Sequence, residues 1–304
     1  MSGTAGYRFD DKALTPFLDF IGSHHEDMIL QPSRGPVQLH HYTDLVGLQG
    51  ILQNHDLWLT NSRYSNDSEE MTHGGKVVLK ALQDRLTSDA VSQYLTRLMQ
   101  LTKESEGVFV CCFCEKDNLL SQWRSYGANG TGVSVQVDPN GFSHLTGPDC
   151  PSGLLRFWRV FYAAEKQDDI VQKAIDYFAP TSQYQPAGQS PDECARRAAE
   201  AIRFFIPTFK NSDFSEEKEW RLIFTPSSAT TVNLRFRVSR NMLVPYYSLK
   251  ELAGTHGVPL LPIMSLRIGP SVHKQLNVES AGLLLAQSGY TNVPVLASDT
   301  PYRS

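Results

Sequence analysis

Four short segments of the sequence gather ionisable, amide and aromatic residues that a hydrophobic core does not require. In chain order they are HHYT at 40–43, LWLTNSRYSNDSE at 57–69, SQWRSYG at 121–127 and EEKEWRLIF at 216–224. Carboxylates can stabilise positive charge that develops in a transition state. An arginine can hold a pyrophosphate through two parallel hydrogen bonds, and an aromatic ring can stack on a flat leaving group. These segments are therefore the candidates for a ligand site.

Each segment lies at the end of a predicted strand, where side chains from distant parts of a chain are able to meet. Alternating or continuous apolar runs predict the strands. They are expected at 37–42, 57–60, 107–114, 132–138, 154–163, 219–225, 232–239, 259–268 and 293–298. Side chains on a strand repeat every two residues, so Glu217, Glu219 and Arg221 are expected on one face.

Helical periodicity separates these strands. It predicts a leading helix at 9–30, a helix at 44–52 with Asp44 as its N-cap, two helices within 72–104, a short helix at 119–126, a helical stretch at 165–210 with a loop around 180–191, and a helix at 271–287. Strands that cluster without strict alternation with the helices indicate an α+β fold.

The composition is that of an ordinary folded protein. With 304 residues, 41% hydrophobic and 20% charged, the chain is neither disordered nor a coiled coil. Its net charge of -4 argues against a general binder of polyanions. No apolar run is long enough to span a bilayer, and the N-terminus lacks the pattern of a secretory signal. The chain has only five cysteines, so we expect a reduced, cytoplasmic protein with no membrane partner.

Several common sites are not indicated. The histidine pairs at 24–25 and 40–41 are adjacent, so the two side chains of each pair diverge, and the cysteines at 111–114 lie in an apolar strand. We therefore expect no metal. The sequence contains no G-x-S-x-G nucleophile motif, and the glycines at 127–132 do not follow a strand and open a helix, as a dinucleotide-binding loop would.

From about residue 37 to the C-terminus, the sequence resembles a large uncharacterised bacterial family. The members of that family read approximately HYT, then LWx[ST]N with NDxxE, then SQWRxYG, ExExR and SxxPYR. The corresponding residues here are His41-Tyr42-Thr43, Asn66-Asp67, Gln122-Trp123-Arg124, Glu217, Glu219 and Arg221, and Ser298-x-x-Pro301-Tyr302-Arg303.

A strand that ends in His-x-Thr, followed by a helix of the form LxxIL and a short LW strand, also resembles the opening of ADP-ribosyltransferases. The resemblance is closest to the His-type enzymes, which include toxins that modify nucleic acids. It implies one domain over 37–304, a split β-sandwich with peripheral helices and a helical insertion at about 165–210. A helical extension at 1–36 would precede this domain.

The same resemblance implies a site for NAD⁺. His41, with Tyr42 and Thr43, would bind the ribose on the adenosine side. Glu219 would hold the nicotinamide ribose as the catalytic carboxylate, and Glu217 would be an accessory carboxylate that meets the acceptor. The remaining candidates are Tyr64, Trp123 or Tyr126 for stacking on nicotinamide, and Arg124, together with Arg221, for the pyrophosphate.

The expected function is NAD⁺-dependent ADP-ribosyl transfer to a nucleic acid or a protein, as a toxin or anti-phage effector that an antitoxin or immunity partner would accompany. NAD⁺ hydrolysis in the same pocket is the enzymatic alternative. A catalytically silent nucleotide-binding or protein-interaction module is the other.

Each site residue also has a purely structural interpretation. His41 can be a strand histidine bonded to backbone, and Trp123 can be a core aromatic with its indole N–H satisfied. The two glutamates and Arg221 can form an ion-pair network of structural value only. The sequence leaves these interpretations open beside the functional ones.

Overall fold

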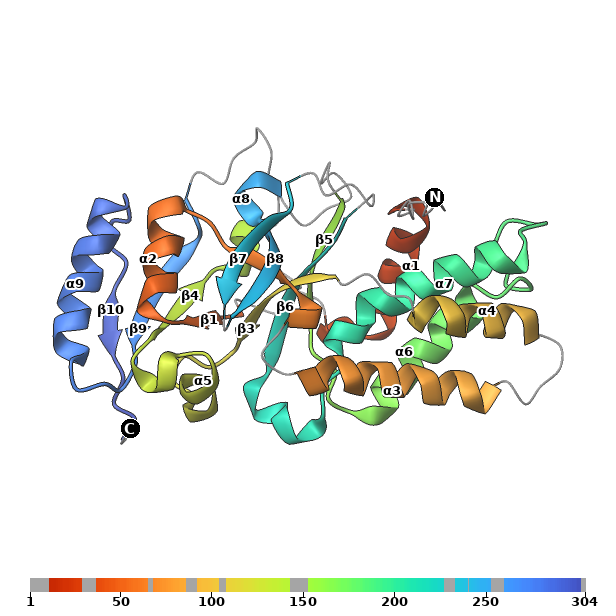
Figure 1. The fold of residues 1–304 in the computed structure, drawn as a ribbon, viewed down its shortest axis with the longest axis horizontal. Coiled ribbons are helices and arrows are strands. Elements are labelled where there is room, and N and C mark those ends of the chain that lie inside the picture. Colours follow the sequence, from red (N-terminus) through yellow and green to blue (C-terminus); the bar gives the residue numbers. More distant parts are fainter. Residues whose placement is uncertain are drawn as a thin grey trace.

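A computed structural model describes residues 11–28, 37–64, 68–85, 92–103, 108–142, 153–226, 233–239, 241–252 and 260–301. It shows a mixed α+β chain (Figure 1). Four residues of the sequence motifs, Asn66, Asp67, Tyr302 and Arg303, lie outside this range.

The strands of the described chain form one ten-stranded sheet. They are β1 (Leu39–Thr43), β2 (Trp58–Asn61), β3 (Phe109–Cys114), β4 (Val133–Val137), β5 (Gly153–Arg159), β6 (Glu219–Pro226), β7 (Arg235–Ser239), β8 (Met242–Ser248), β9 (Ile263–Ile268) and β10 (Val295–Ala297). The order is β10-β9-β4-β1-β3-β2-β8-β7, and β6 pairs with both β3 and β5. The pairs are antiparallel except β9 with β10.

The helices lie on two sides of this sheet. They are α1 (Asp11–His24), α2 (Leu45–Asn54), α3 (Ser68–Arg85), α4 (Ser92–Lys103), α5 (Leu120–Ser125), α6 (Ala164–Tyr177), α7 (Pro191–Phe205), α8 (Leu249–Leu252) and α9 (Lys274–Gln287). The predicted N-cap of α2 is confirmed, because the Asp44 carboxylate accepts the N–H of Gly47 at 2.6 Å.

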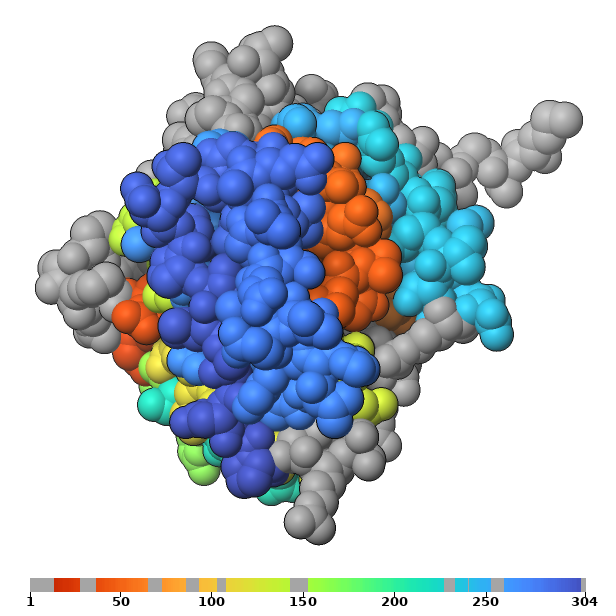
Figure 2. All heavy atoms as spheres, turned by 90° about the vertical axis from the view of Figure 1, so that its left-hand side faces the viewer, coloured from red at the N-terminus to blue at the C-terminus, as the bar shows by residue number. Residues whose placement is uncertain are grey.

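One hydrophobic core joins the sheet to α2, α8 and α9. Leu52, Leu252 and Leu285 from these helices pack in one buried cluster with Val135 of β4 and Leu222 of β6. Figure 2 shows this side of the molecule, with α9 in blue, α2 beside it in orange and β7 and β8 in cyan next to α2.

A second core joins five helices to β5 and β6, on the right of Figure 1. Phe17 of α1 lies there, with its ring 5.1 Å from that of Phe178 and 6.2 Å from that of Phe205. The leading helix, the helices between β2 and β3 and the helical stretch after β5 therefore form one helical lobe. The predicted extension and insertion pack together rather than standing apart.

The central strand β3 meets two diverging strands on one of its edges. Its other edge is paired with β6 along its whole length, from Phe109 to Cys114. On the edge opposite β6, Val110 of β3 pairs with Thr60 of β2, whereas Cys114 of β3 pairs with His40 of β1. Cys112 lies between these two pairings. We call this divergence of β1 and β2 the β3 split.

The structure differs from the predicted elements most clearly at α1 and at β8. The leading helix was expected to reach residue 30, but α1 ends at His24 and a 3₁₀ turn follows at Glu26–Met28. The strand β8 was not predicted, because Pro245 interrupts its apolar pattern and proline is unusual inside a sheet. Asn241, directly before β8, has a φ of 61°, in the left-handed region.

Replacing Phe17 with alanine is expected to destabilise the helical lobe. The side chain is fully buried, so the cavity left behind is expected to cost about 3–5 kcal/mol of unfolding free energy. Urea unfolding measures the change. The matched control is Phe236→Ala, because Phe236 is 55% exposed and its loss is expected to change stability by about 0.5 kcal/mol or less. Equal effects of the two substitutions would contradict the packing described for α1.

Candidate functional site

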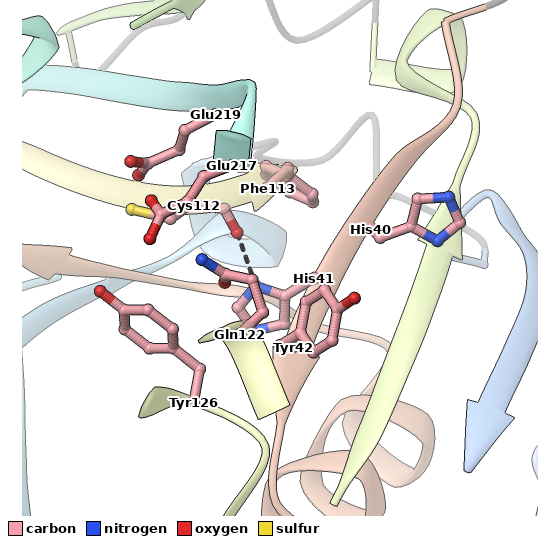
Figure 3. Close-up of a pocket in the computed structure, with 9 residues that line it drawn as sticks. All are labelled: His40, His41, Tyr42, Cys112, Phe113, Gln122, Tyr126, Glu217 and Glu219. Carbon is pink, nitrogen blue, oxygen red and sulfur yellow. Dashed lines mark hydrogen bonds between the residues drawn. The ribbon is translucent and has the colours of Figure 1, made fainter. Parts of the chain in front are cut away.

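A pocket opens at the β3 split, close to the junction of β1, β3, β6 and α5 (Figure 3). It is lined by His40, His41, Tyr42, Cys112, Phe113, Gln122, Tyr126, Glu217 and Glu219. The empty space is about 340 Å³ when the open mouth is included. In Figure 3 the Gln122 amide and the Tyr126 hydroxyl lie on the same side as the two carboxylates, while His40 points away.

His41 is held by the backbone of β3. Its Nδ1–H donates to the carbonyl oxygen of Cys112 at 2.9 Å (dashed in Figure 3), which leaves Nε2 as the acceptor nitrogen of the neutral ring. Burial lowers the pKa of His41 and the nearby charge of Arg237 lowers it further, although the bond to Cys112 opposes both. The ring is therefore neutral at pH 7. The structural interpretation of His41, as a strand histidine bonded to backbone, expects this hydrogen bond. The bond is present, and it fixes the ring at the pocket wall.

Four charged side chains form a buried cluster behind the pocket: Lys210, Glu217, Glu219 and Arg221, which we call the charge cluster. Each is at most 6% exposed. Lys210 Nζ lies 2.6 Å from Glu217 Oε2 and 3.0 Å from Glu219 Oε2. Arg221 binds Glu219 through two hydrogen bonds, from Nε at 2.7 Å and from Nη2 at 2.9 Å. The four formal charges sum to zero.

The pairing keeps Glu219 ionised. Burial alone would raise the pKa of this carboxyl, but Arg221 and Lys210 attract its charge, and hydrogen bonds from Arg221 and the Cys112 thiol add to that attraction. The net effect holds the pKa of Glu219 well below its usual range.

The prediction that Glu217 lies on the same strand as Glu219 is wrong. The strand β6 begins at Glu219, and Glu217 ends a 3₁₀ turn that spans Ser212–Glu217. Between them Lys218 has a φ of 45°, in the left-handed region. The two carboxylates meet nevertheless, because Lys210 binds both.

Lys210 is a site residue that the sequence analysis missed. Lysine is almost never fully buried unless it is paired, so a single lysine in an apolar stretch gives no signal. Its position is set by a backbone bond from Lys210 N to Phe161 O at 3.1 Å. Gln122 and Cys112 were also not assigned to the site, although both lie in segments that the sequence analysis described.

Trp123 does not line the pocket, but it packs against Tyr42, which does. The side chain is fully buried, its indole N–H donates to Asn118 Oδ1 at 2.9 Å, and its ring lies 4.7 Å from that of Tyr42. A Cβ at Gly127 would come within 2.6 Å of the Trp123 ring, so only glycine lets the chain turn there. The structure therefore supports the interpretation of Trp123 as a core aromatic. Gln122 of α5 and Tyr126, which directly follows α5, line the pocket instead.

The C-terminal motif anchors the loop that precedes α5. The Ser298 hydroxyl donates to Asn118 Oδ1 at 2.6 Å, the same oxygen that accepts the indole N–H of Trp123. The Asn118 amide donates to Asp299 at 2.8 Å. Ser298 does not line the pocket. It affects the pocket indirectly, by holding Asn118, which in turn holds Trp123.

Of the residues that the sequence analysis assigned to the site, one group lines the pocket: His41, Tyr42, Tyr126, Glu217 and Glu219. Another group does not: Thr43, Tyr64, Trp123, Arg124 and Arg221.

The residues outside the pocket lie in different surroundings. Arg221 is buried in the charge cluster, where it also donates to the carbonyl of Pro207. Thr43 packs where α2 begins, against Gly47. Tyr64 and Arg124 are exposed to solvent. The predicted meeting of His41 and Glu219 is thus observed, whereas Thr43 and Trp123 do not join it.

Comparison with known proteins gives one match. Residues 122–222, about a third of the chain, match a family described as "Protein of unknown function (DUF2971)". The matched segment begins at Gln122 and includes the whole charge cluster. No curated protein and no solved structure matches the chain.

The described residues contain no group of three or more His, Cys, Asp or Glu side chains placed to hold a metal ion. Within the same part of the chain, no helix is both long enough and apolar enough to cross a membrane.

Replacing Lys210 with methionine is expected to lower the unfolding free energy by about 3–5 kcal/mol, because two buried carboxylates lose their shared cation. Adding Glu217→Gln should restore part of the loss. Denaturant unfolding tests both variants. The control is Lys250→Met, since Lys250 is exposed and its ammonium group donates to the Asn54 carbonyl rather than to a carboxylate. If Lys210→Met is no less stable than this control, the charge cluster does not contribute as described.

The low pKa of Glu219 also predicts a pH dependence. A carboxyl whose folded pKa lies below its unfolded value, about 4.3, stabilises the fold above the unfolded pKa. This contribution is lost as the pH falls through the folded pKa. The stability difference between wild type and Glu219→Gln should therefore be largest near pH 7 and shrink below about pH 4. Urea titrations at pH 7, 4 and 3 measure it, and a difference that stays constant with pH would contradict the assignment.

Proposed function

We propose that the protein is an ADP-ribosyltransferase that takes NAD⁺ as donor and a nucleic acid or protein as acceptor. The observation that supports this most is that His41 of β1 and Glu219 of β6, far apart in sequence, line one pocket at the β3 split. A histidine and a late carboxylate in a split sheet are the two features that the ADP-ribosyltransferase resemblance requires.

The proposed reaction breaks the bond between nicotinamide and ribose. The bonding electrons leave with nicotinamide, and C1′ of the ribose becomes an oxocarbenium-like centre. A nucleophile of the acceptor then bonds to C1′, and its proton passes to the solvent. In the ground state the positive charge is on the pyridinium ring, and it moves to the ribose as the bond breaks. A fixed carboxylate beside C1′ therefore stabilises the transition state more than the ground state.

The charge cluster suits this role because it holds its carboxylates ionised and in place. Glu219 is proposed as the catalytic carboxylate, held by Arg221 and Lys210 so that no reorganisation is needed during the reaction. Glu217 is proposed to meet the acceptor. Because the cluster is neutral in sum, its effect depends on which carboxylate lies nearest to C1′ rather than on net charge.

His41 and the α5 residues are proposed to hold the substrate. The neutral His41 ring offers Nε2 as an acceptor for a ribose hydroxyl. Tyr126 and Gln122 supply a ring and an amide on the opposite wall for the nicotinamide group. Because a whole dinucleotide is larger than the pocket, one end of it must extend past the mouth.

The test is to measure nicotinamide release and acceptor labelling by the purified protein, with and without cell lysate. Release that requires lysate supports transfer, and release without lysate supports NAD⁺ hydrolysis in the same pocket. No release under either condition would overturn the enzymatic proposal in favour of a binding module.

Glu219→Gln is expected to lower the rate of nicotinamide release about a hundred- to a thousandfold, because it removes one preorganised charge. Glu217→Gln should reduce acceptor labelling more than slow hydrolysis, because water needs less orientation than a macromolecule. The matched control is Glu216→Gln, since Glu216 is the exposed neighbour in the same turn. Circular dichroism checks that each variant is folded. Near-normal activity of folded Glu219→Gln would remove this residue from the mechanism.

A further inference from the structure

Arg237 on the edge strand β7 is a cation without an anionic partner in the described chain. No carboxylate of that part of the structure lies within ion-pair distance of it. Its Nη2 donates to Thr60 Oγ1 at 3.2 Å, and its guanidinium carbon lies 5.8 Å from the centre of the Trp58 ring. Its Nε is buried and has no hydrogen-bond partner among the residues that the structure describes. The guanidinium is therefore held in place while part of its hydrogen-bonding capacity is unused.

The sheet register places Arg237 on the face that carries the pocket. Thr60 lies opposite Val110 of β3 and also opposite Tyr246 of β8. Tyr246 in turn lies opposite Arg235 of β7. Since side chains repeat every two residues along a strand, Arg237 shares this face with Cys112, two residues after Val110. Cys112 lines the pocket.

The charge of Arg237 also reaches across the β3 split. It lowers the pKa of His41, and it interacts with Asp44, which directly follows β1. Figure 2 shows α2, which begins after Asp44, next to the β7–β8 hairpin on the molecular surface. Arg237 therefore lies close enough to His41 and Asp44 for their charges to interact.

A partly buried guanidinium with an unmet N–H is unfavourable unless something binds it. The ligand that fits is an anion, and the planar fork matches a phosphate through two hydrogen bonds. Trp58, stacked on Tyr246 at 4.3 Å and 40% exposed, adds an aromatic wall beside it. A phosphate attached to a nucleoside matches both features.

We propose that Arg237 binds the pyrophosphate of the dinucleotide where it leaves the pocket. This inference rests on the proposed function, in which the pocket holds the nicotinamide end. It gives Arg237 the role that the sequence analysis assigned to Arg124, which is exposed on α5. Arg235 differs from Arg237 because it is exposed and already paired with Glu251 at 2.9 Å.

Calorimetric titration tests the proposal without any turnover. The probes are ADP-ribose, ADP and inorganic pyrophosphate, each added to wild type, Arg237→Gln, Arg237→Lys and the matched control Arg235→Gln. Arg237→Gln is expected to weaken ADP-ribose binding about 10- to 100-fold, as for the loss of hydrogen bonds to a charged group. The ADP-ribose affinity of Arg237→Lys should lie between those of wild type and Arg237→Gln, because lysine keeps the charge but loses the planar fork of the guanidinium. Arg235→Gln should bind as wild type does.

The outcomes separate this inference from the proposed function. Loss of ADP-ribose binding in Arg237→Gln supports the inference even if the wild type never releases nicotinamide, a result that would overturn only the enzymatic proposal. Equal ADP-ribose binding by wild type and Arg237→Gln overturns the inference about Arg237. A wild type that binds none of the three probes overturns it as well. Binding of pyrophosphate as tightly as ADP-ribose would overturn the nucleotide assignment and identify a free-phosphate site. Unfolding midpoints of each variant verify that the fold is kept.

Discussion

The hydrogen bond from His41 to the Cys112 carbonyl is the interaction on which the site depends. A central strand must satisfy its backbone groups on both edges, because an unpaired buried carbonyl is costly. At the β3 split, β1 and β2 pair with different ends of β3, and a side chain replaces the missing strand at Cys112. The sheet can therefore open without leaving that carbonyl unpaired. The same bond fixes the tautomer of His41 and directs its other nitrogen away from the backbone.

The charge cluster sets the opposite wall of the opening. Burying four charges is expensive, and exchange for apolar residues is often neutral or stabilising, so stability alone does not explain the cluster. Its position beside the pocket offers another reason, because Lys210 and Arg221 hold two carboxylates at fixed points of the wall. The C-terminal segment supports the third wall, since Ser298 and Trp123 share one oxygen of Asn118.

Local patterns in the sequence predicted the α+β class, the Asp44 cap and most strands, because these depend on side-chain periodicity within a few residues. The resemblance to ADP-ribosyltransferases also placed His41 and Glu219 in one site. The failures concern interactions between distant segments. Trp123 was misplaced because burial of an aromatic depends on what packs over it, here Tyr42 and Asn118. Lys210 and Arg237 gave no signal, because a lysine or arginine is normally solvated and only contacts with distant segments hold these two in place.

The central claim is that the pocket at the β3 split receives the nicotinamide end of NAD⁺. A crystal structure of the protein with a non-hydrolysable NAD⁺ analogue tests it most directly. The account predicts the nicotinamide ribose between His41 and Glu219, the ring near Tyr126, and the pyrophosphate extending toward Arg237. An analogue bound elsewhere on the protein, with this pocket empty, would contradict the account.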